Sequence, residues 1–173
     1  MGQMAQKITK TDNKKLIKAL NEAFAEEWLA YYQYWIGAKV VEGIMRPNVQ
    51  KELEEHAKEE LGHAEKLAER IVQLGGTPLL NPKDWEKYAK CKYDEPRNAN
   101  VLALLKQNIA GERCAIKRYQ EICEMCYDGK DIATFHLARS IMDDEIEHEQ
   151  DLEDLFNDID SFIKSYGCNC KKK

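Results

Sequence analysis

Two Glu-x-x-His motifs carry the most specific chemical signal in this sequence of 173 residues. They are Glu60-Leu-Gly-His63 and Glu145-Ile-Glu-His148. Residues three apart lie on one face of a helix, so the carboxylate and the imidazole of each motif can reach a single point. Both motifs lie within apolar stripes, which are series of apolar residues that recur every three or four positions and so share one face of a helix. A carboxylate and an imidazole on a buried helix face are typical ligands of a transition metal.

Two further glutamates, Glu27 and Glu112, interrupt the apolar stripes of two other segments. Glu27 precedes Glu60 by 33 residues, and Glu112 precedes Glu145 by 33. In antiparallel hairpins this spacing places all four carboxylates and both histidines at one level of the core. Buried carboxylates need compensating charge, and two divalent cations would neutralise four of them. Mixed oxygen and imidazole ligation favours iron or manganese, with zinc as a competitor. A metal-free network of hydrogen bonds is the weaker alternative.

Four long segments supply these residues, and each is rich in good helix formers with apolar residues every three or four positions. Prolines and the Gly75-Gly76 and Asp128-Gly129 pairs separate them, and strand signals are absent. We therefore predict an all-α four-helix bundle, as one domain over residues 1–173, with flexible tails at 1–12 and 164–173. The expected helices span residues 13–43, 48–74, 97–127 and 130–165.

The lengths of the connections predict the topology. The first two helices and the last two are joined by short turns, so each pair is expected to form an antiparallel hairpin. The connection between the pairs, from Gly75 to about Arg97, is too long for a turn. It is long enough to run the length of the bundle, and we expect it to be a crossover with a short helix near Asp84 to Lys90.

Composition narrows the class of protein further. The chain is 43% hydrophobic and 33% charged, which fits a globular domain with a core, and its net charge is −5. The acidic balance disfavours nucleic acid and anionic membrane as partners, and no apolar run approaches the ~20 residues of a membrane helix. The segment up to Lys15 is polar and lacks the apolar part of a secretory signal, and six cysteines are too few for a secreted disulfide framework. We expect a cytoplasmic protein.

The sequence resembles the ferritin-like superfamily from about Lys14 to Phe162. The run Glu27-Trp-Leu-Ala-Tyr-Tyr-Gln-Tyr-Trp is similar to the first-helix motif of bacterioferritins, and Tyr34 matches their tyrosine beside the di-iron site. The resemblance implies a ferroxidase centre that holds two iron ions per subunit. Its ligands would be Glu60 and Glu145 as a bridging pair, Glu27 and Glu112 as terminal ligands, and His63 and His148.

Two departures move the resemblance from bacterioferritins toward mini-ferritins. Leu61 stands where the haem methionine of bacterioferritins would fall, so we expect no haem. The crossover and the tail are similar to those of DNA-protection-during-starvation (Dps) proteins. A bacterioferritin-like site in a Dps-like chain resembles the thioferritins, whose cysteine pair is matched by Cys91 and Cys114 as a redox relay or a local disulfide. The resemblance implies a hollow dodecameric shell that oxidises Fe(II), preferably with H2O2 rather than O2, stores the ferric product and protects against oxidative stress.

Several alternatives stay open at this point. One is a non-storing di-iron or di-manganese peroxidase related to rubrerythrin or manganese catalase. Another is a nucleoid protein that binds DNA through its basic tails, although the acidic body opposes this; the lysines concerned are Lys7, Lys10, Lys14, Lys15 and residues 171–173. His56, one turn before Glu60, is either a neighbour of the metal ligands or a satisfied core histidine. Tyr119, seven residues after Glu112, is expected near the same level.

Overall fold

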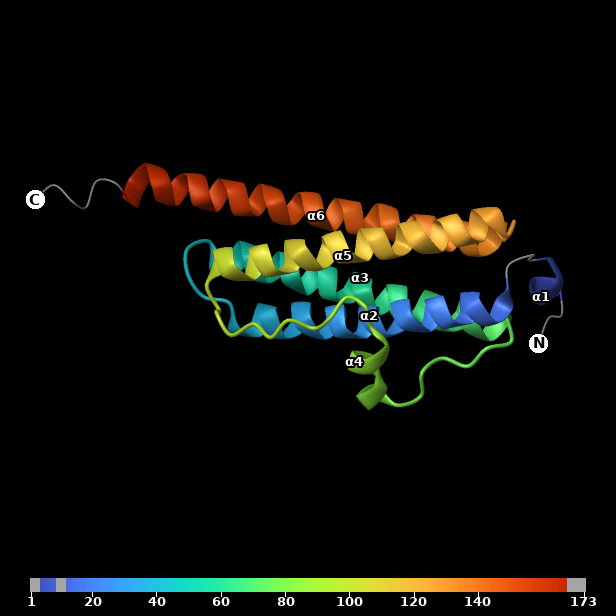
Figure 1. Cartoon of the computed structure of the whole chain (residues 1–173). Helices are drawn as coiled ribbons and strands as arrows, with labels where there is room; N and C mark the ends of the chain where they lie inside the picture. Colours follow the sequence, from blue (N-terminus) through green and yellow to red (C-terminus); the bar gives the residue numbers. More distant parts are fainter. Residues whose placement is uncertain (1–3, 9–11, 168–173) are drawn as a thin grey trace, which may run out of the picture.

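Four long helices form an antiparallel bundle in the computed structural model, which describes residues 4–8 and 12–167 (Figure 1). The predicted all-α bundle is confirmed. None of the described helices is both long enough and apolar enough to cross a membrane. The elements are α1 (Met4–Ile8), α2 (Asn13–Val40), α3 (Arg46–Gln73), the 3-10 helix η1 (Pro82–Asp84), α4 (Trp85–Tyr88), α5 (Val101–Asp128) and α6 (Ile132–Gly167).

Local signals set the helix ends. The side chains of Asp12 and Asn100 accept hydrogen bonds from the backbone N–H two residues later, which caps α2 and α5. Capping by Asn100 explains why α5 begins at Val101 and not at residue 97. Gly75, with φ of 83°, follows the end of α3 in the left-handed conformation that glycine adopts without strain.

The ends of the chain differ in part from the expected tails. Helix α6 continues to Gly167, so residues 164–167 are helical, and α1 is a short helix inside the segment 1–12. Lys7 lies on α1, and Lys14 and Lys15 lie in the first turn of α2. Lys10, Cys168, Cys170 and residues 171–173 lie outside the described residues.

The crossover between α3 and α5 runs back along the bundle and carries η1 and α4, as predicted (Figure 1). Contacts along its length attach it to α2 and to the residues that follow α2. The amide of Asn21 donates to Thr77 O at 3.1 Å and accepts from Leu79 N at 2.8 Å. Trp85 stacks on Trp28 with ring centroids 5.0 Å apart. At its end, the backbone beside Asn100 pairs with Glu42. The crossover therefore has one defined path over α2.

Two apolar clusters fill the bundle, one on each side of a polar level. One contains Leu20, Leu67 and Ile122, and the other contains Leu53 and Leu105. These five side chains are fully buried, and each contributes about 1.5–3 kcal/mol by leaving water. The polar level between the clusters is where the four stripe glutamates lie.

A buried ion pair joins α3 to the beginning of α6. Arg70 Nη2 lies 3.0 Å from Asp131 Oδ1, and Arg70 Nε donates to Thr134 Oγ1 at 2.7 Å. Asp131 also accepts from Thr134 N at 3.0 Å and so caps the first turn of α6. All three residues are buried, so the arginine charge has few other partners.

We expect Asp131→Asn to lower the free energy of unfolding by about 3 kcal/mol, because the variant leaves a buried guanidinium without its counter-charge. The control is Asp143→Asn, which removes the exposed partner of Arg139 and is expected to cost about 0–1 kcal/mol. Denaturant titration of both variants at equal protein concentration, with a metal chelator present, makes the comparison. Similar losses in the two variants would contradict this account of the Arg70 pair.

Candidate metal centre

Four carboxylates and two histidines converge at the polar level, and they form two overlapping groups. The first is Glu27, Glu60, His63 and Glu145, and the second is Glu60, Glu112, Glu145 and His148. Within each group the potential ligand atoms all lie within 4.8 Å of one another. All six residues are buried, and Glu60 and Glu145 belong to both groups. The arrangement fits two cations with Glu60 and Glu145 between them.

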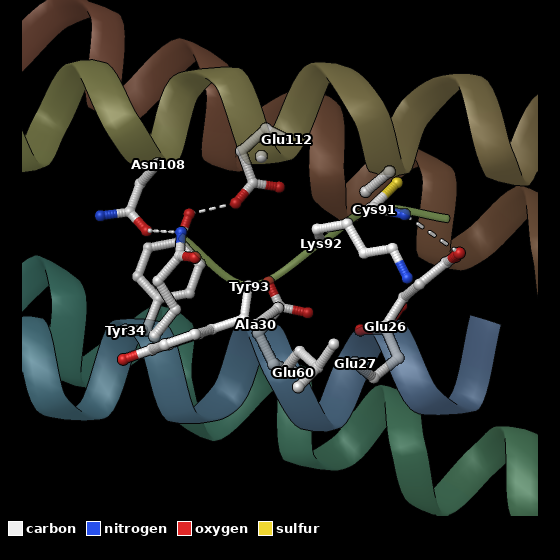
Figure 2. Close-up of a pocket in the computed structure, with 14 residues that line it drawn as sticks. Glu26, Glu27, Ala30, Tyr34, Glu60, Cys91, Lys92, Tyr93, Asn108 and Glu112 are labelled. Carbon is white, nitrogen blue, oxygen red and sulfur yellow. Dashed lines mark hydrogen bonds between the residues drawn. The ribbon is translucent and has the colours of Figure 1, made fainter. Parts of the chain in front are cut away.

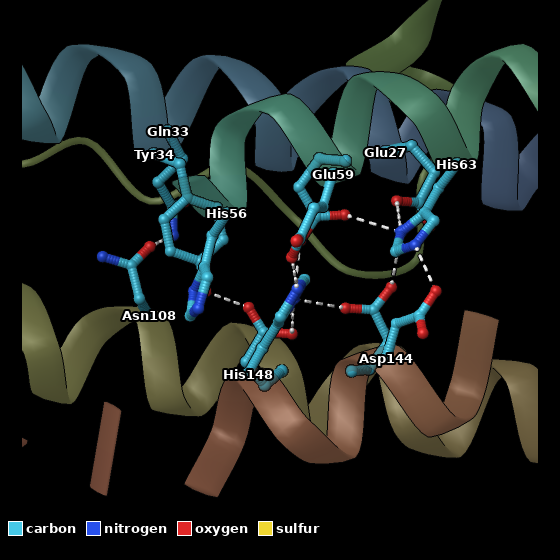
Figure 3. Close-up of polar contacts among 12 residues, drawn as sticks. Glu27, Gln33, Tyr34, His56, Glu59, His63, Asn108, Asp144 and His148 are labelled. Atoms are coloured by element: carbon cyan, nitrogen blue, oxygen red, sulfur yellow. Dashed lines mark hydrogen bonds and ion pairs between the residues drawn. The ribbon is translucent and has the colours of Figure 1, made fainter. Parts of the chain in front are cut away.

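Each histidine turns its Nδ1 atom toward the carboxylates (Figure 3). His63 Nδ1 lies 3.3 Å from Glu60 Oε2, 3.5 Å from Glu27 Oε2 and 3.2 Å from Glu145 Oε1. On the other side, His148 Nδ1 lies 3.1 Å from Glu145 Oε2 and 3.5 Å from Glu60 Oε1. The two ring nitrogens therefore occupy equivalent places in the two groups.

The outer nitrogen of each histidine is held by a carboxylate that sequence reasoning missed. His63 Nε2 lies 3.1 Å from Asp144, and His148 Nε2 lies 2.6 Å from Glu59. Such a bond fixes the orientation and the tautomer of a ligand imidazole. Both acids directly precede a shared glutamate, as Glu59-Glu60 and Asp144-Glu145, and each reaches the histidine of the opposite helix. This repeated acidic pair was the signal available in the sequence.

Two buried tyrosines lie at the same level, and each donates a hydrogen bond to a glutamate of the other helix hairpin. The hydroxyl of Tyr34 donates to Glu112, and the hydroxyl of Tyr119 donates to Glu27. Tyr34 follows Glu27 by seven residues but bonds Glu112. Tyr119 follows Glu112 by seven residues but bonds Glu27. Burial and the nearby carboxylates raise the pKa of both hydroxyls well above the usual value, so both remain donors.

Burial and neighbouring charges strongly shift the pKa values of the groups at this level. Burial, together with the charge of Glu60, raises the pKa of Glu27 to about 8, and burial likewise raises the pKa of Glu112. Burial alone would lower the pKa of His148, but bonds to Glu145 and Glu60 raise it to about 12. Without cations the centre therefore retains protons at neutral pH. Binding of cations must displace these protons, and so metal affinity should rise with pH.

Two carboxylate oxygens show that the residues suit cations. Glu27 Oε2 and Glu145 Oε1 are buried and accept no hydrogen bond, and both face the single Nδ1 atom of His63, at 3.5 and 3.2 Å. One imidazole N–H cannot satisfy two buried carboxylate oxygens, and a bound cation would satisfy both. The oxygen and imidazole donors fit iron or manganese, and zinc could compete for them.

A small pocket of about 50 Å³ reaches the centre from the face that the crossover covers (Figure 2). Glu27, Tyr34, Glu60 and Glu112 line it on the inside, and Cys91 lies on the crossover side. The sulfur atoms of Cys91 and Cys114 form a disulfide, which joins the crossover to α5 beside the pocket. The two cysteines thus lie together near the centre and are not ligands of it.

Glu26, the residue before Glu27, anchors the crossover at the same place. Its Oε1 accepts from Lys90 N at 2.6 Å and from Cys91 N at 3.3 Å, and Arg118 Nε lies 3.5 Å from Oε2. Burial raises the pKa of Glu26 to about 7, although these donors and the arginine oppose the shift. Sequence reasoning missed this residue because its partners lie on an aperiodic segment.

Comparison with known proteins agrees with this geometry. Residues 17–162 match the family model described as the ferritin-like domain. The chain belongs to the ferritin-like family. A DNA protection during starvation protein of Pyrococcus furiosus is 34% identical over 151 residues, covering 85% of this chain and 80% of that protein. A bacterioferritin of Rhodobacter capsulatus is 32% identical, covering 80% and 81%.

Among solved structures of ferritin-like proteins, a dodecameric thioferritin, the bacterioferritin-related protein of Bacteroides fragilis, is similar to this chain. It is 54% identical, has a TM-score of 0.88 and covers 91% of this chain and 93% of its own. The predicted resemblance to Dps-like and thioferritin-type members of the family is therefore confirmed.

We expect Glu26→Gln to change the pH dependence of stability in this ferritin-like protein. The folded protein holds the Glu26 proton up to about pH 7, whereas the unfolded chain releases it near the ordinary value of 4.5. The contribution of Glu26 to the free energy of unfolding is therefore fully present below pH 4.5. It is lost as the pH rises through 7, and the loss is about 3 kcal/mol. Glutamine does not titrate, so the free energy of unfolding of the variant, relative to that of the parent protein, should rise by that amount between pH 4.5 and 8.

Denaturant titrations at several pH values in the presence of a chelator measure this difference. The control is Glu65→Gln, an exposed change on α3 that should leave the pH profile unaltered. A difference between Glu26→Gln and the parent that is constant with pH would show that Glu26 does not titrate in this range.

Proposed function

We propose that this protein is a ferroxidase that oxidises Fe(II) at the paired-metal centre, preferably with H2O2, and stores the ferric product in a hollow homo-oligomeric shell. The observation that carries the proposal is the pair of overlapping ligand groups that share Glu60 and Glu145. Membership of the ferritin-like family and the likeness to a dodecameric thioferritin support it.

The chain prepares the centre for two divalent ions in three ways. The four glutamates match the charge of two such ions, and the oxygens of Glu27 and Glu145 that accept no hydrogen bond are available to them. Asp144 and Glu59 accept hydrogen bonds from Nε2 of His63 and His148, so once the ions displace the Nδ1 protons, each imidazole would present its Nδ1 lone pair to the centre. The tyrosine hydroxyls hold Glu112 and Glu27 in position.

Two Fe(II) ions supply two electrons together, and with two protons these reduce one H2O2 to two water molecules. This stoichiometry avoids release of a hydroxyl radical and gives the proposed protection against oxidative stress. The protein's part is to keep both ions in one site, so that the electrons are delivered as a pair. Protons displaced from His63, His148 and Glu27 on loading are available nearby for this reduction.

The cysteine pair is proposed to act in redox chemistry beside the centre. Cys91 and Cys114 are already bonded in the structure, and Cys91 lines the pocket that leads to Glu27 and Glu60. The buried Cys123 and Cys126, by contrast, pack in an apolar cluster, and burial raises the pKa of Cys126 to about 12. These two free thiols are therefore poorly suited to such a role.

Storage is tested by iron content on a size column with light-scattering detection, after addition of Fe(II) and H2O2. Twelve chains of 20.1 kDa give a particle of roughly 241 kDa. We expect tens of iron atoms per chain to elute with such a particle. About two iron atoms per chain on a dimer or small oligomer would instead identify a non-storing di-iron or di-manganese peroxidase.

The double variant Glu60→Ala, Glu145→Ala should fold but lose rapid Fe(II) oxidation, with a rate at least ~100-fold lower, because both shared ligands are gone. The matched control is Glu69→Ala, Asp158→Ala, which removes one exposed carboxylate from each of the same two helices. Stopped-flow absorbance after mixing with Fe(II) and H2O2 measures the rates. Parental rates in the first variant would refute the assignment of the site.

A further inference from the structure

A groove of about 600 Å³ lies on the opposite side of the bundle from the crossover, between α3 and α6. Its lining contains six carboxylates, three histidines and two lysines. The side chains of His63 and His148 also line this groove, so the groove adjoins the paired-metal centre. A surface of this charge attracts cations.

Three residues of the groove form a separate group of ligands. Glu52 and His56 come from α3, and Asp151 comes from α6. Their potential ligand atoms all lie within 4.8 Å of one another, and His56 Nε2 lies 3.3 Å from Glu52 Oε1. None of the three belongs to the groups around Glu60 and Glu145. One imidazole and two carboxylates are a typical set for a divalent transition metal.

His56 is buried, and one of its two ring nitrogens lacks a hydrogen-bond partner. Its side chain is only 3% exposed, yet its Nδ1 atom has no hydrogen-bond partner. It is therefore not the satisfied core histidine that the sequence left open. The ring is held in place by packing, with its face on His148 at 4.0 Å between centroids and the edge contact of Tyr34 at 5.3 Å (Figure 3). This packing keeps Nε2 directed at Glu52. In the tautomer whose proton is on Nδ1, the Nε2 lone pair faces a carboxylate, and a cation between them would turn this repulsion into ligation.

We propose that Glu52, His56 and Asp151 bind a third divalent transition-metal ion, between the groove and the paired-metal centre. Two carboxylates and a neutral imidazole match the charge of one such ion. The imidazole favours Fe²⁺, Mn²⁺, Co²⁺ or Zn²⁺ over Mg²⁺ or Ca²⁺. Glu52 and Asp151 are partly exposed, so this ion can exchange with the groove more readily than ions at the buried centre. The site exists whether or not the proposed ferroxidase activity is correct.

The test uses Zn²⁺, which needs no oxidant, on crystals of the assembled protein, with anomalous diffraction at the zinc edge. We expect a peak at Glu52, His56 and Asp151 in addition to the peaks at the paired centre. Equilibrium dialysis in solution should give one ion per chain more for the parent than for Glu52→Gln, Asp151→Asn. That variant keeps side-chain volume and leaves buried His56 unchanged, and circular dichroism checks its fold.

The matched control is Glu55→Gln, Asp154→Asn, which removes one carboxylate from each helix near the group but outside it. It should keep the third ion, which separates ligation from the general charge of the groove. Absence of the peak in the parent at saturating Zn²⁺, or its persistence in the Glu52/Asp151 variant, would overturn the proposal. Loss of the paired peaks alone would instead count against the proposed function and leave this site standing.

Discussion

The burial of four carboxylates at one level of an apolar bundle is the constraint on which the structure depends. Each buried charge costs several kcal/mol unless it is compensated, and like charges at this distance add to the cost. The histidines on α3 and α6, the two tyrosine hydroxyls and the protons retained by Glu27 and Glu112 all offset that cost. The same demand for positive charge makes the level suited to bind cations.

Helical periodicity and spacing predicted the centre because they act along single helices and across short turns. The interval of 33 residues from Glu27 to Glu60, repeated from Glu112 to Glu145, requires only two antiparallel hairpins. The bonds from Glu59 and Asp144 to the opposite histidines depend on how α3 is rotated about its axis relative to α6. An apolar stripe shows which face of a helix is buried, but it does not fix this rotation closely enough to pair single residues. The group of Glu52, His56 and Asp151 escaped prediction for the same reason.

The two faces of the centre differ in kind. On one face the crossover is fixed by Glu26, by the Trp28–Trp85 stack and by the Cys91–Cys114 disulfide, and it narrows access to a small pocket. On the other face α3 and α6 leave an open acidic groove. The sequence predicted a crossover along the bundle but not which helix it covers, since its anchors are single polar and aromatic contacts without a period.

The division of the apolar core into two clusters has a consequence for the exchange of ions. Each cluster draws side chains from all four long helices, so each end of the bundle is packed independently of the polar level. The ligands are therefore held near their positions from both sides before any ion arrives. An ion could then enter or leave repeatedly while the scaffold keeps its shape, as the proposed handling of iron as cargo requires.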